Sequence, residues 1–108
     1  MRIEINASVG EGSLAISKNA LTIAFIKEGV TKTKIIGFKD FGKMIEAGHK
    51  EISEGDLGVV ELPLEDKWVA FKMRAHTDLV VSLKIFPSPQ NELIFSMEKI
   101  EETLFRLE

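Results

Sequence analysis

The spacing of hydrophobic residues changes twice along this chain, and these changes constrain the fold more than any other feature of the sequence. Over roughly the first third of the chain, apolar and polar side chains alternate, beginning with Ile3 and Ile5, which is the pattern of half-buried strands. Between Phe41 and Ile52 the apolar residues recur at offsets of three and four, which is typical of an amphipathic helix. Alternation returns after Gly55. The sequence therefore predicts strands, a helix and strands again.

The first half of the chain is expected to contain four short strands and one helix. The strands are predicted at residues 2–9, 14–16, 21–25 and 31–37. Turn-forming residues lie between them, among them the Gly-Glu-Gly-Ser run at residues 10–13. Asp40 is the expected N-cap of the helix, and Gly55 is expected to stop it just beyond its end.

The second half is predicted to begin with three strands, at residues 57–62, 68–75 and 79–86. The last two form the best-patterned hairpin of the chain, because each has an unbroken apolar row on one side. The rows are Val69, Phe71, Met73 and Ala75 on one strand, and Leu79, Val81, Leu83 and Ile85 on the other. We expect these rows to face the core.

The C-terminal segment admits two interpretations. Five apolar residues fit one long helix capped by Ser88, namely Leu93, Met97, Ile100, Leu104 and Leu107. The alternative is a loop over residues 87–91, a strand from Glu92 to Ser96 and a helix from Met97 to Leu107. The Leu-Ile-Phe run favours the strand, and the two prolines before it suit a loop.

These elements predict an α+β fold with an antiparallel sheet, or a pair of sheets, of seven to eight strands and two helices. A chain of 108 residues is about one domain long, so we expect a single domain over residues 1–108. If the C-terminal strand forms, residues 1–55 and 56–108 are pseudo-repeats, each with four strands and a helix. A generic meander with two helices on one face is the alternative.

Composition excludes several classes of protein. The chain has no cysteine, so it has no disulfide, no thiolate zinc site and no cysteine nucleophile. Its apolar runs are shorter than the roughly 18 residues that span a bilayer, and its N-terminus does not resemble a signal peptide. We therefore expect a cytoplasmic protein with no membrane partner.

Glu46 and His49 have the Glu-x-x-His spacing by which a helix directs two ligands at one metal ion. The di-metal architecture needs a second such motif, which the sequence lacks. Glu46 also precedes Lys50 by four residues, so a helix ion pair is the simpler interpretation. His76 lies in a predicted turn, and spacing alone places no nucleophile beside a base. We predict no catalytic residue, no metal and no cofactor, and hence a non-enzymatic binding protein.

The segment NELIFSMEKIEETLFRLE, from Asn91 to Glu108, resembles the last strand and helix of a PUR repeat. In such repeats a short apolar strand enters the helix through a Ser-Met step, here Ser96-Met97. The order of elements over the whole chain also resembles the Whirly and PUR-repeat group of single-stranded nucleic-acid-binding proteins and the related coactivators. This resemblance implies units of four antiparallel strands and a helix, and a single-stranded DNA or RNA ligand.

Basic residues gather in the predicted strands. Residues 1–36 and 67–90 contain nine Lys or Arg against four acids, whereas the remainder of the chain has a net charge of −8. On the sides opposite the apolar rows, the hairpin presents cations and aromatic rings. Cations follow phosphates, and each ring that stacks on a base contributes about 1–3 kcal/mol. The predicted nucleic-acid-binding residues are Trp68, Lys72, Arg74, Lys84 and Phe86.

A structural interpretation of the same residues is also open. Lys and Arg are common on solvent-facing strands, where they block edge-to-edge aggregation, and a tryptophan at a strand start is often a core or rim residue. A surface of this kind could instead bind another protein through the helix faces or a sheet edge. The candidate partners are therefore a single-stranded nucleic acid, a protein partner, or a second copy of the chain in a homo-oligomer.

Overall fold

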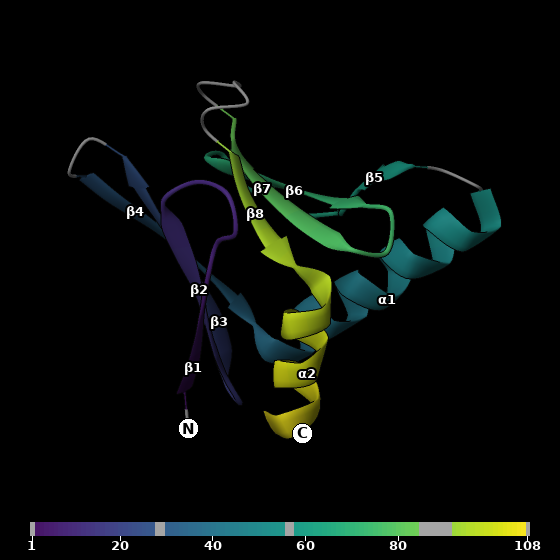
Figure 1. Cartoon of the computed structure of the whole chain (residues 1–108), viewed down its shortest axis with the longest axis horizontal. Coiled ribbons are helices and arrows are strands. Elements are labelled where there is room, and N and C mark those ends of the chain that lie inside the picture. Colours follow the sequence, from purple (N-terminus) through teal and green to yellow (C-terminus); the bar gives the residue numbers. More distant parts are fainter. Residues whose placement is uncertain (1, 28–29, 56–57, 85–91, 108) are drawn as a thin grey trace.

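The computed structural model describes residues 2–27, 30–55, 58–84 and 92–107. Its elements form two units of the same order, each with four strands followed by a helix (Figure 1). The first unit comprises β1 (Arg2–Asn6), β2 (Gly12–Ser17), β3 (Ala20–Lys27), β4 (Val30–Gly37) and α1 (Phe38–Gly55). The second comprises β5 (Val59–Glu61), β6 (Val69–Arg74), β7 (Asp78–Leu83), β8 (Glu92–Ser96) and α2 (Met97–Leu107). The predicted α+β class and the repeated unit are confirmed.

The eight strands form two four-stranded sheets, so of the two predicted arrangements the pair of sheets is confirmed and the single sheet is not. Their orders are β1-β2-β3-β4 and β5-β6-β7-β8, and every neighbouring pair is antiparallel. Helix α1 follows β4 directly and has 18 residues, so it extends about 27 Å at 1.5 Å per residue. It carries the chain away from the first sheet before β5 begins, and β5 therefore pairs only within a new sheet.

The C-terminal ambiguity is resolved in favour of a strand and a shorter helix. Strand β8 pairs with β7 in a register that places Phe95 opposite Leu79, and α2 begins at the next residue after β8. Ser96 caps α2 through its hydroxyl, which accepts a hydrogen bond from the Lys99 amide at 3.4 Å.

The prediction that Asp40 is the N-cap of the first helix is wrong. Helix α1 begins at Phe38, so Asp40 lies within its first turn. The Phe38 amide donates a hydrogen bond of 3.4 Å to the carbonyl oxygen of Asn19, which precedes β3. This bond ties the start of the helix to the first sheet, so no side-chain cap separates β4 from α1. A carboxylate in the first turn still interacts favourably with the helix dipole.

Each helix packs against strands of the other unit. Helix α1 contacts β5 and β6 of the second sheet, whereas α2 contacts β1 and β2 of the first. Gly48 allows the close approach of α1, because a β-carbon there would lie 2.7 Å from Leu62 Cδ2 and 2.9 Å from Met73 Cε. The two units are thus interlocked. Neither helix of the described chain is long and apolar enough to cross a bilayer.

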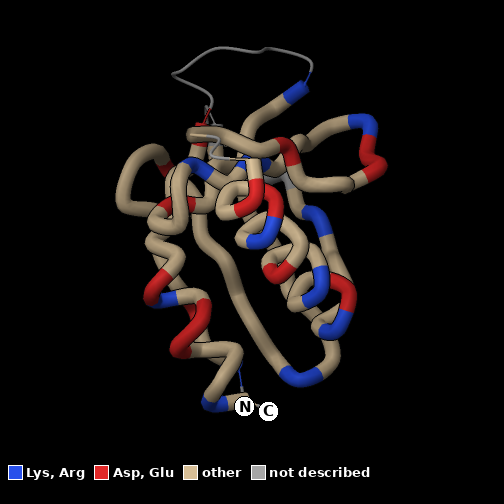
Figure 2. Tube along the Cα trace, turned by 90° about the vertical axis from the view of Figure 1, so that its right-hand side faces the viewer, with Lys and Arg blue, Asp and Glu red and all other residues tan. Residues whose placement is uncertain are grey.

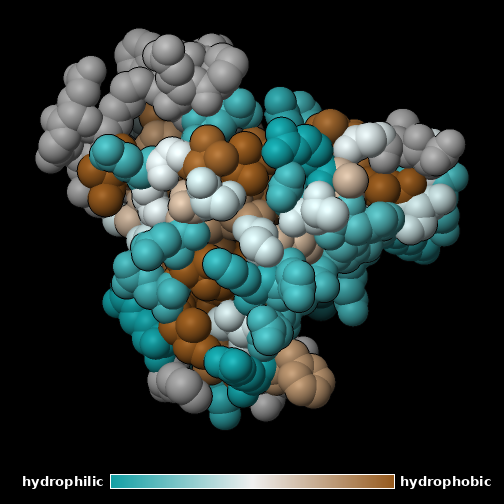
Figure 3. Space-filling model, in the orientation of Figure 1, coloured by the Kyte–Doolittle hydropathy of each residue, from teal (hydrophilic) through white to brown (hydrophobic). Residues whose placement is uncertain are grey.

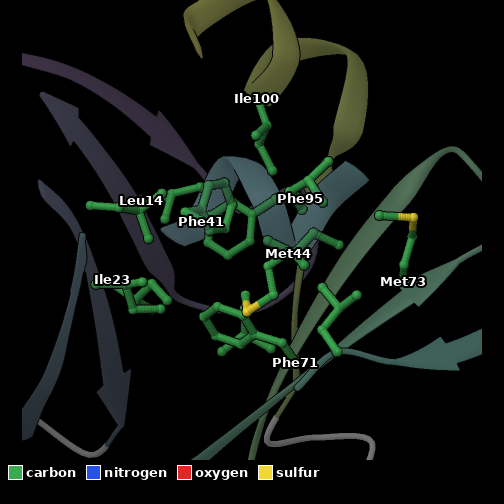
Figure 4. Packing of buried hydrophobic residues seen from close by; sticks show 14 of the residues in the cluster. Leu14, Ile23, Phe41, Met44, Phe71, Met73, Phe95 and Ile100 are labelled. Atoms are coloured by element: carbon green, nitrogen blue, oxygen red, sulfur yellow. The ribbon is translucent and has the colours of Figure 1, made fainter. Parts of the chain in front are cut away.

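One hydrophobic core joins the two sheets and both helices. Its fully buried side chains come from every layer, and Figure 4 shows Leu14, Ile23, Phe41, Phe71 and Phe95 converging between the sheets and helices. The described residues of the apolar rows predicted for the hairpin face this core, except that Leu83 is half-buried and Ala75 is exposed in the turn. Burial of these rows fixes which face of the second sheet remains outward.

The β1–β2 connection links the two sheets along the edge of β8. Ser8 donates its amide to the Ile94 carbonyl at 2.7 Å, and the Ile94 amide donates to the Val9 carbonyl at 3.1 Å. Gly10 follows with φ of +87°, and a β-carbon at this position would lie 2.5 Å from the Glu92 carbonyl oxygen. Only glycine therefore suits this close approach.

Candidate functional site

The four predicted binding residues that the structure describes lie in and beside the β6–β7 hairpin, and Lys72 of β6 is on the face of the second sheet that is turned away from α1. The register places Lys72 opposite Glu61 on one side and opposite Val80 on the other, so these side chains share the outward face. Buried Phe71 and Met73 occupy the inner face beneath α1. The side of β6 that faces the core and the side that faces outward are therefore those that the alternation in the sequence predicts.

A shallow hollow brings two of the predicted cations together. It has a volume of about 360 Å³, and both Lys72 and Lys84 line it. Ala70 and Ser82, which are directly opposite each other in β6 and β7, provide small side chains between the two lysines. Glu61 also lines the hollow and reduces its net positive charge.

Trp68 lies next to this hollow, at the start of β6. Its carbonyl oxygen accepts a hydrogen bond from the Lys84 amide at 2.7 Å, so Trp68 and Lys84 are opposite each other across the hairpin. The side chain is 48% exposed and lines a small cavity of about 160 Å³ beside β3 and β4, together with Lys34 and Asp66. One ring and two lysines predicted from the sequence therefore occupy one region.

Asp66 organises this region through contacts of both its side chain and its carbonyl group. One carboxylate oxygen accepts hydrogen bonds from the amides of Trp68, at 2.7 Å, and Val69, at 3.0 Å. The other oxygen pairs with Lys34 Nζ of the first sheet at 2.7 Å. The Asp66 carbonyl accepts a hydrogen bond from Lys84 Nζ. Asp66 thus connects the two sheets and positions Trp68 and Lys84.

These contacts lower the pH at which the Asp66 carboxyl titrates. Burial raises the pKa of this carboxyl, since only 10% of the side chain is exposed. The hydrogen bond from Lys34, the two bonds from the Trp68 and Val69 amides, and the nearby Lys34 charge outweigh burial and lower the pKa from 3.8 to about 2. Asp66 therefore holds a negative charge beside two lysines.

The two other predicted residues do not join this region. Arg74 lies at the opposite end of β6, where its Nε and Nη2 donate to one carboxylate oxygen of Asp78 at 3.2 and 2.9 Å. Its charge is therefore largely offset by Asp78. Phe86 lies outside the described residues.

A second cluster of polar side chains was not anticipated from the sequence. His49 of α1 and His76 of the β6–β7 turn stack with their ring centroids 5.0 Å apart, and their Nδ1 atoms are 2.7 Å apart. His49 Nε2 lies 2.5 Å from a carboxylate oxygen of Glu101 on α2. Ser53 Oγ lies 3.5 Å from His76 Nε2. The simpler interpretation of Glu46 as a partner of Lys50 is not seen among the ion pairs of the described chain.

This cluster links three elements of the fold through side-chain contacts. A hydrogen bond between two Nδ1 atoms requires that one of the two imidazoles lacks its proton there, so the pair carries at most one positive charge. The chain of contacts runs from Glu101 through both histidines to Ser53. A general base must reach its hydroxyl within about 2.6–3.2 Å, and the Ser53 distance exceeds this range. The arrangement joins α1, α2 and the hairpin turn.

Zinc is expected to leave the melting temperature of the protein unchanged. Other side chains already contact both ring nitrogens of His49, and within the described chain no three His, Asp or Glu side chains are placed to hold a metal ion. Thermal denaturation with and without excess zinc chloride measures this. Stabilisation by zinc that disappears in His49→Ala would contradict the prediction.

Comparison of the chain with protein-family models, with curated proteins and with solved structures gives no match. The site therefore rests on its own geometry. A sequence signal for Asp66 did exist, because an aspartate in a turn commonly accepts bonds from the backbone amides that follow, and Asp66 lies three residues before β6. For the cluster of His49, His76 and Glu101 no local signal existed, since the three residues are far apart in the sequence.

Proposed function

We propose that this protein is a non-enzymatic binding module that takes a single-stranded DNA or RNA across the outward face of its second sheet. The observation that carries the proposal is the hollow shared by Lys72 and Lys84, which lies on the face opposite α1. Two ammonium groups around small side chains suit two successive phosphates of an extended strand.

Trp68 supports the proposal because it supplies an aromatic ring beside the two lysines. Its side chain is half exposed, and it lies directly across the hairpin from Lys84. A ring in this position can stack on a base while the lysines contact the phosphates, and stacking accepts any base. The expected ligand is therefore a single strand bound with little sequence preference.

The repeated four-strand-plus-helix unit is consistent with the group that the sequence resembles, but a shared architecture by itself does not imply a shared function. The stronger support is chemical. Two phosphate contacts on a single strand predict a slope of about −1.4 in a plot of log binding constant against log salt concentration. A small slope is expected because Glu61 and Asp78 offset part of the positive charge on this face.

Charge reversal in the hollow is the direct test. Lys72→Glu combined with Lys84→Glu is expected to weaken the binding of a mixed-sequence single strand by at least about tenfold at low salt, because two phosphate contacts become repulsive. Trp68 is the sole tryptophan, so quenching of its fluorescence reports binding at this site. The salt slope should also approach zero in the double variant.

Lys50→Glu is the matched control, since Lys50 is an exposed lysine on α1 and lies away from the second sheet's outward face. It should bind as the unaltered protein does. If the unaltered protein shows neither quenching of Trp68 nor a salt-dependent change in electrophoretic mobility with single strands, the nucleic-acid proposal is wrong.

A further inference from the structure

Helix α2 exposes its largest apolar side chain on the side that faces away from the core. Phe105 is 80% exposed, which exceeds every other large hydrophobic residue in the described chain. The opposite side of the helix is fully occupied, because Met97, Ile100 and Leu107 are buried in the core. An aromatic side chain gains substantially from burial, so Phe105 is a natural anchor for an interface.

A groove of about 470 Å³ lies beside Phe105, between α1 and α2. Its apolar lining includes Phe38, Ile45 and Leu104. Gly42 also lines it, and a β-carbon at this position would meet no atom within 4 Å. Glycine inside a helix is less favourable than alanine, so Gly42 leaves this space open while it lowers the stability of α1. In Figure 3 the most hydrophobic surface beside α2 lies toward the first sheet, and the surface toward α1 is mostly hydrophilic.

A pair of lysines and a group of acids lie on opposite sides of Phe105. Lys39 and Lys43 are four residues apart on α1 and line the groove, which Glu46 and Glu101 also line. On the other side of α2, a second hollow is lined by Glu98, Glu102 and Asp78. Phe105 lines both hollows and therefore stands between the lysine pair and the acidic hollow. Figure 2 shows that basic and acidic residues are interspersed along the helices.

We propose that this surface binds a second copy of the same chain about a two-fold axis. Each Phe105 enters the partner's groove above Gly42, and the acidic side of each α2 faces Lys39 and Lys43 of the other subunit. A surface that contains both a protruding side chain and a groove for it, with opposite charges beside them, is complementary to itself. This is the property that a two-fold symmetric interface requires. Every contact then occurs twice, so a single substitution acts twice.

Sedimentation velocity of the full chain, without nucleic acid, tests this proposal. The unaltered protein is expected to change from monomer to dimer as its concentration rises from the micromolar to the millimolar range. Phe105→Glu should weaken this association by at least about a hundredfold, because it places a charge in each apolar groove. Its melting temperature at low concentration should not change, since the side chain is exposed in the monomer.

Gly42→Ala separates association from folding. The added methyl group should raise the melting temperature of the monomer through helix propensity, yet it occupies the space for the partner's Phe105 and should weaken association. A loss of stability and a loss of association together would instead indicate general damage to α1. That result would overturn the assignment of the groove.

A charge exchange provides the positive test. Lys43→Glu alone should weaken association, and Glu102→Lys in the same chain should restore it, because the contacts across the two-fold axis are then reversed. Ile35→Glu is the matched control, since Ile35 is 65% exposed on β4 of the first sheet. A monomer at all concentrations overturns the proposal. A dimer that survives Phe105→Glu, or that is disrupted only by Ile35→Glu, also overturns it.

Discussion

Replacing Phe71 with alanine is expected to lower the free energy of unfolding by about 3–5 kcal/mol. The Phe71 side chain is 1% exposed on β6, and its ring meets that of Phe41 on α1 edge to face, with centroids 6.5 Å apart and ring planes at 88°. Loss of the ring leaves a cavity between units that pack on each other. Urea unfolding followed by circular dichroism measures the change in the midpoint.

Phe105→Ala is the matched control for this prediction. It removes the same atoms from a side chain that is 80% exposed, so the free energy of unfolding should change by less than about 0.5 kcal/mol. Phe71→Leu provides a milder change that should fold and lose less stability than Phe71→Ala. Equal losses for Phe71→Ala and Phe105→Ala would mean that the second sheet does not share the core of α1.

Asp66→Asn is expected to destabilise the protein by about 2 kcal/mol at neutral pH and by little near pH 2. The pKa of Asp66 is about 2 in the folded protein, against 3.8 in the absence of these contacts. A lowered pKa means that the charged form stabilises the fold, and lowering a pKa by one corresponds to about 1.4 kcal/mol. This stabilisation is complete above about pH 4 and is lost as the pH falls toward 2. Urea unfolding of both proteins over this pH range measures the difference.

Asp78→Asn is the matched control, because Asp78 also pairs with a cation but its side chain is 28% exposed. Exposed ion pairs contribute roughly 0–1 kcal/mol, so this change should cost less than Asp66→Asn. A difference between Asp66→Asn and the unaltered protein that stays constant from neutral pH to pH 2 would show that charge is not the cause. The asparagine oxygen can still accept the bonds from the Trp68 and Val69 amides, so the turn itself should persist.

Local patterns in the sequence were sufficient for the elements through the β6–β7 hairpin and for their inner faces, but they left the C-terminal segment open between one long helix and a strand followed by a shorter helix. Alternation around Val69, Phe71 and Met73 predicts both strand β6 and its buried side. The step from alternation to spacings of three and four predicts a helix that includes Phe41, although a cap at Asp40 would start that helix too late. An N-cap is a weak signal when a strand leads directly into a helix, because a backbone bond from another part of the sheet replaces it.

The candidate site was predictable only in part. Lys72, Lys84 and Trp68 can be identified because each stands at a position opposite the buried row of the hairpin. Successive side chains of a strand point to opposite faces, so these positions follow from the sequence. The same alternation places Arg74 on this face, but Asp78, at the start of the next strand, forms an ion pair with Arg74 across the turn. The alternation along a strand shows on which face of the sheet a side chain lies, but it does not show which charges on that face offset one another.

The sequence by itself determined the order of the strands and helices through the β6–β7 hairpin and which side of each is buried, because these properties depend on neighbouring residues. It left open whether a strand precedes the last helix and hence whether the unit is repeated. Only the tertiary structure decided that the strands form two sheets, that each helix packs on the other unit, and that Asp66 joins Lys34 to Lys84. It also brought His49, His76 and Glu101 together. These contacts connect residues distant in the chain, and such pairings arise from the packing of whole elements and leave no periodic trace in the sequence.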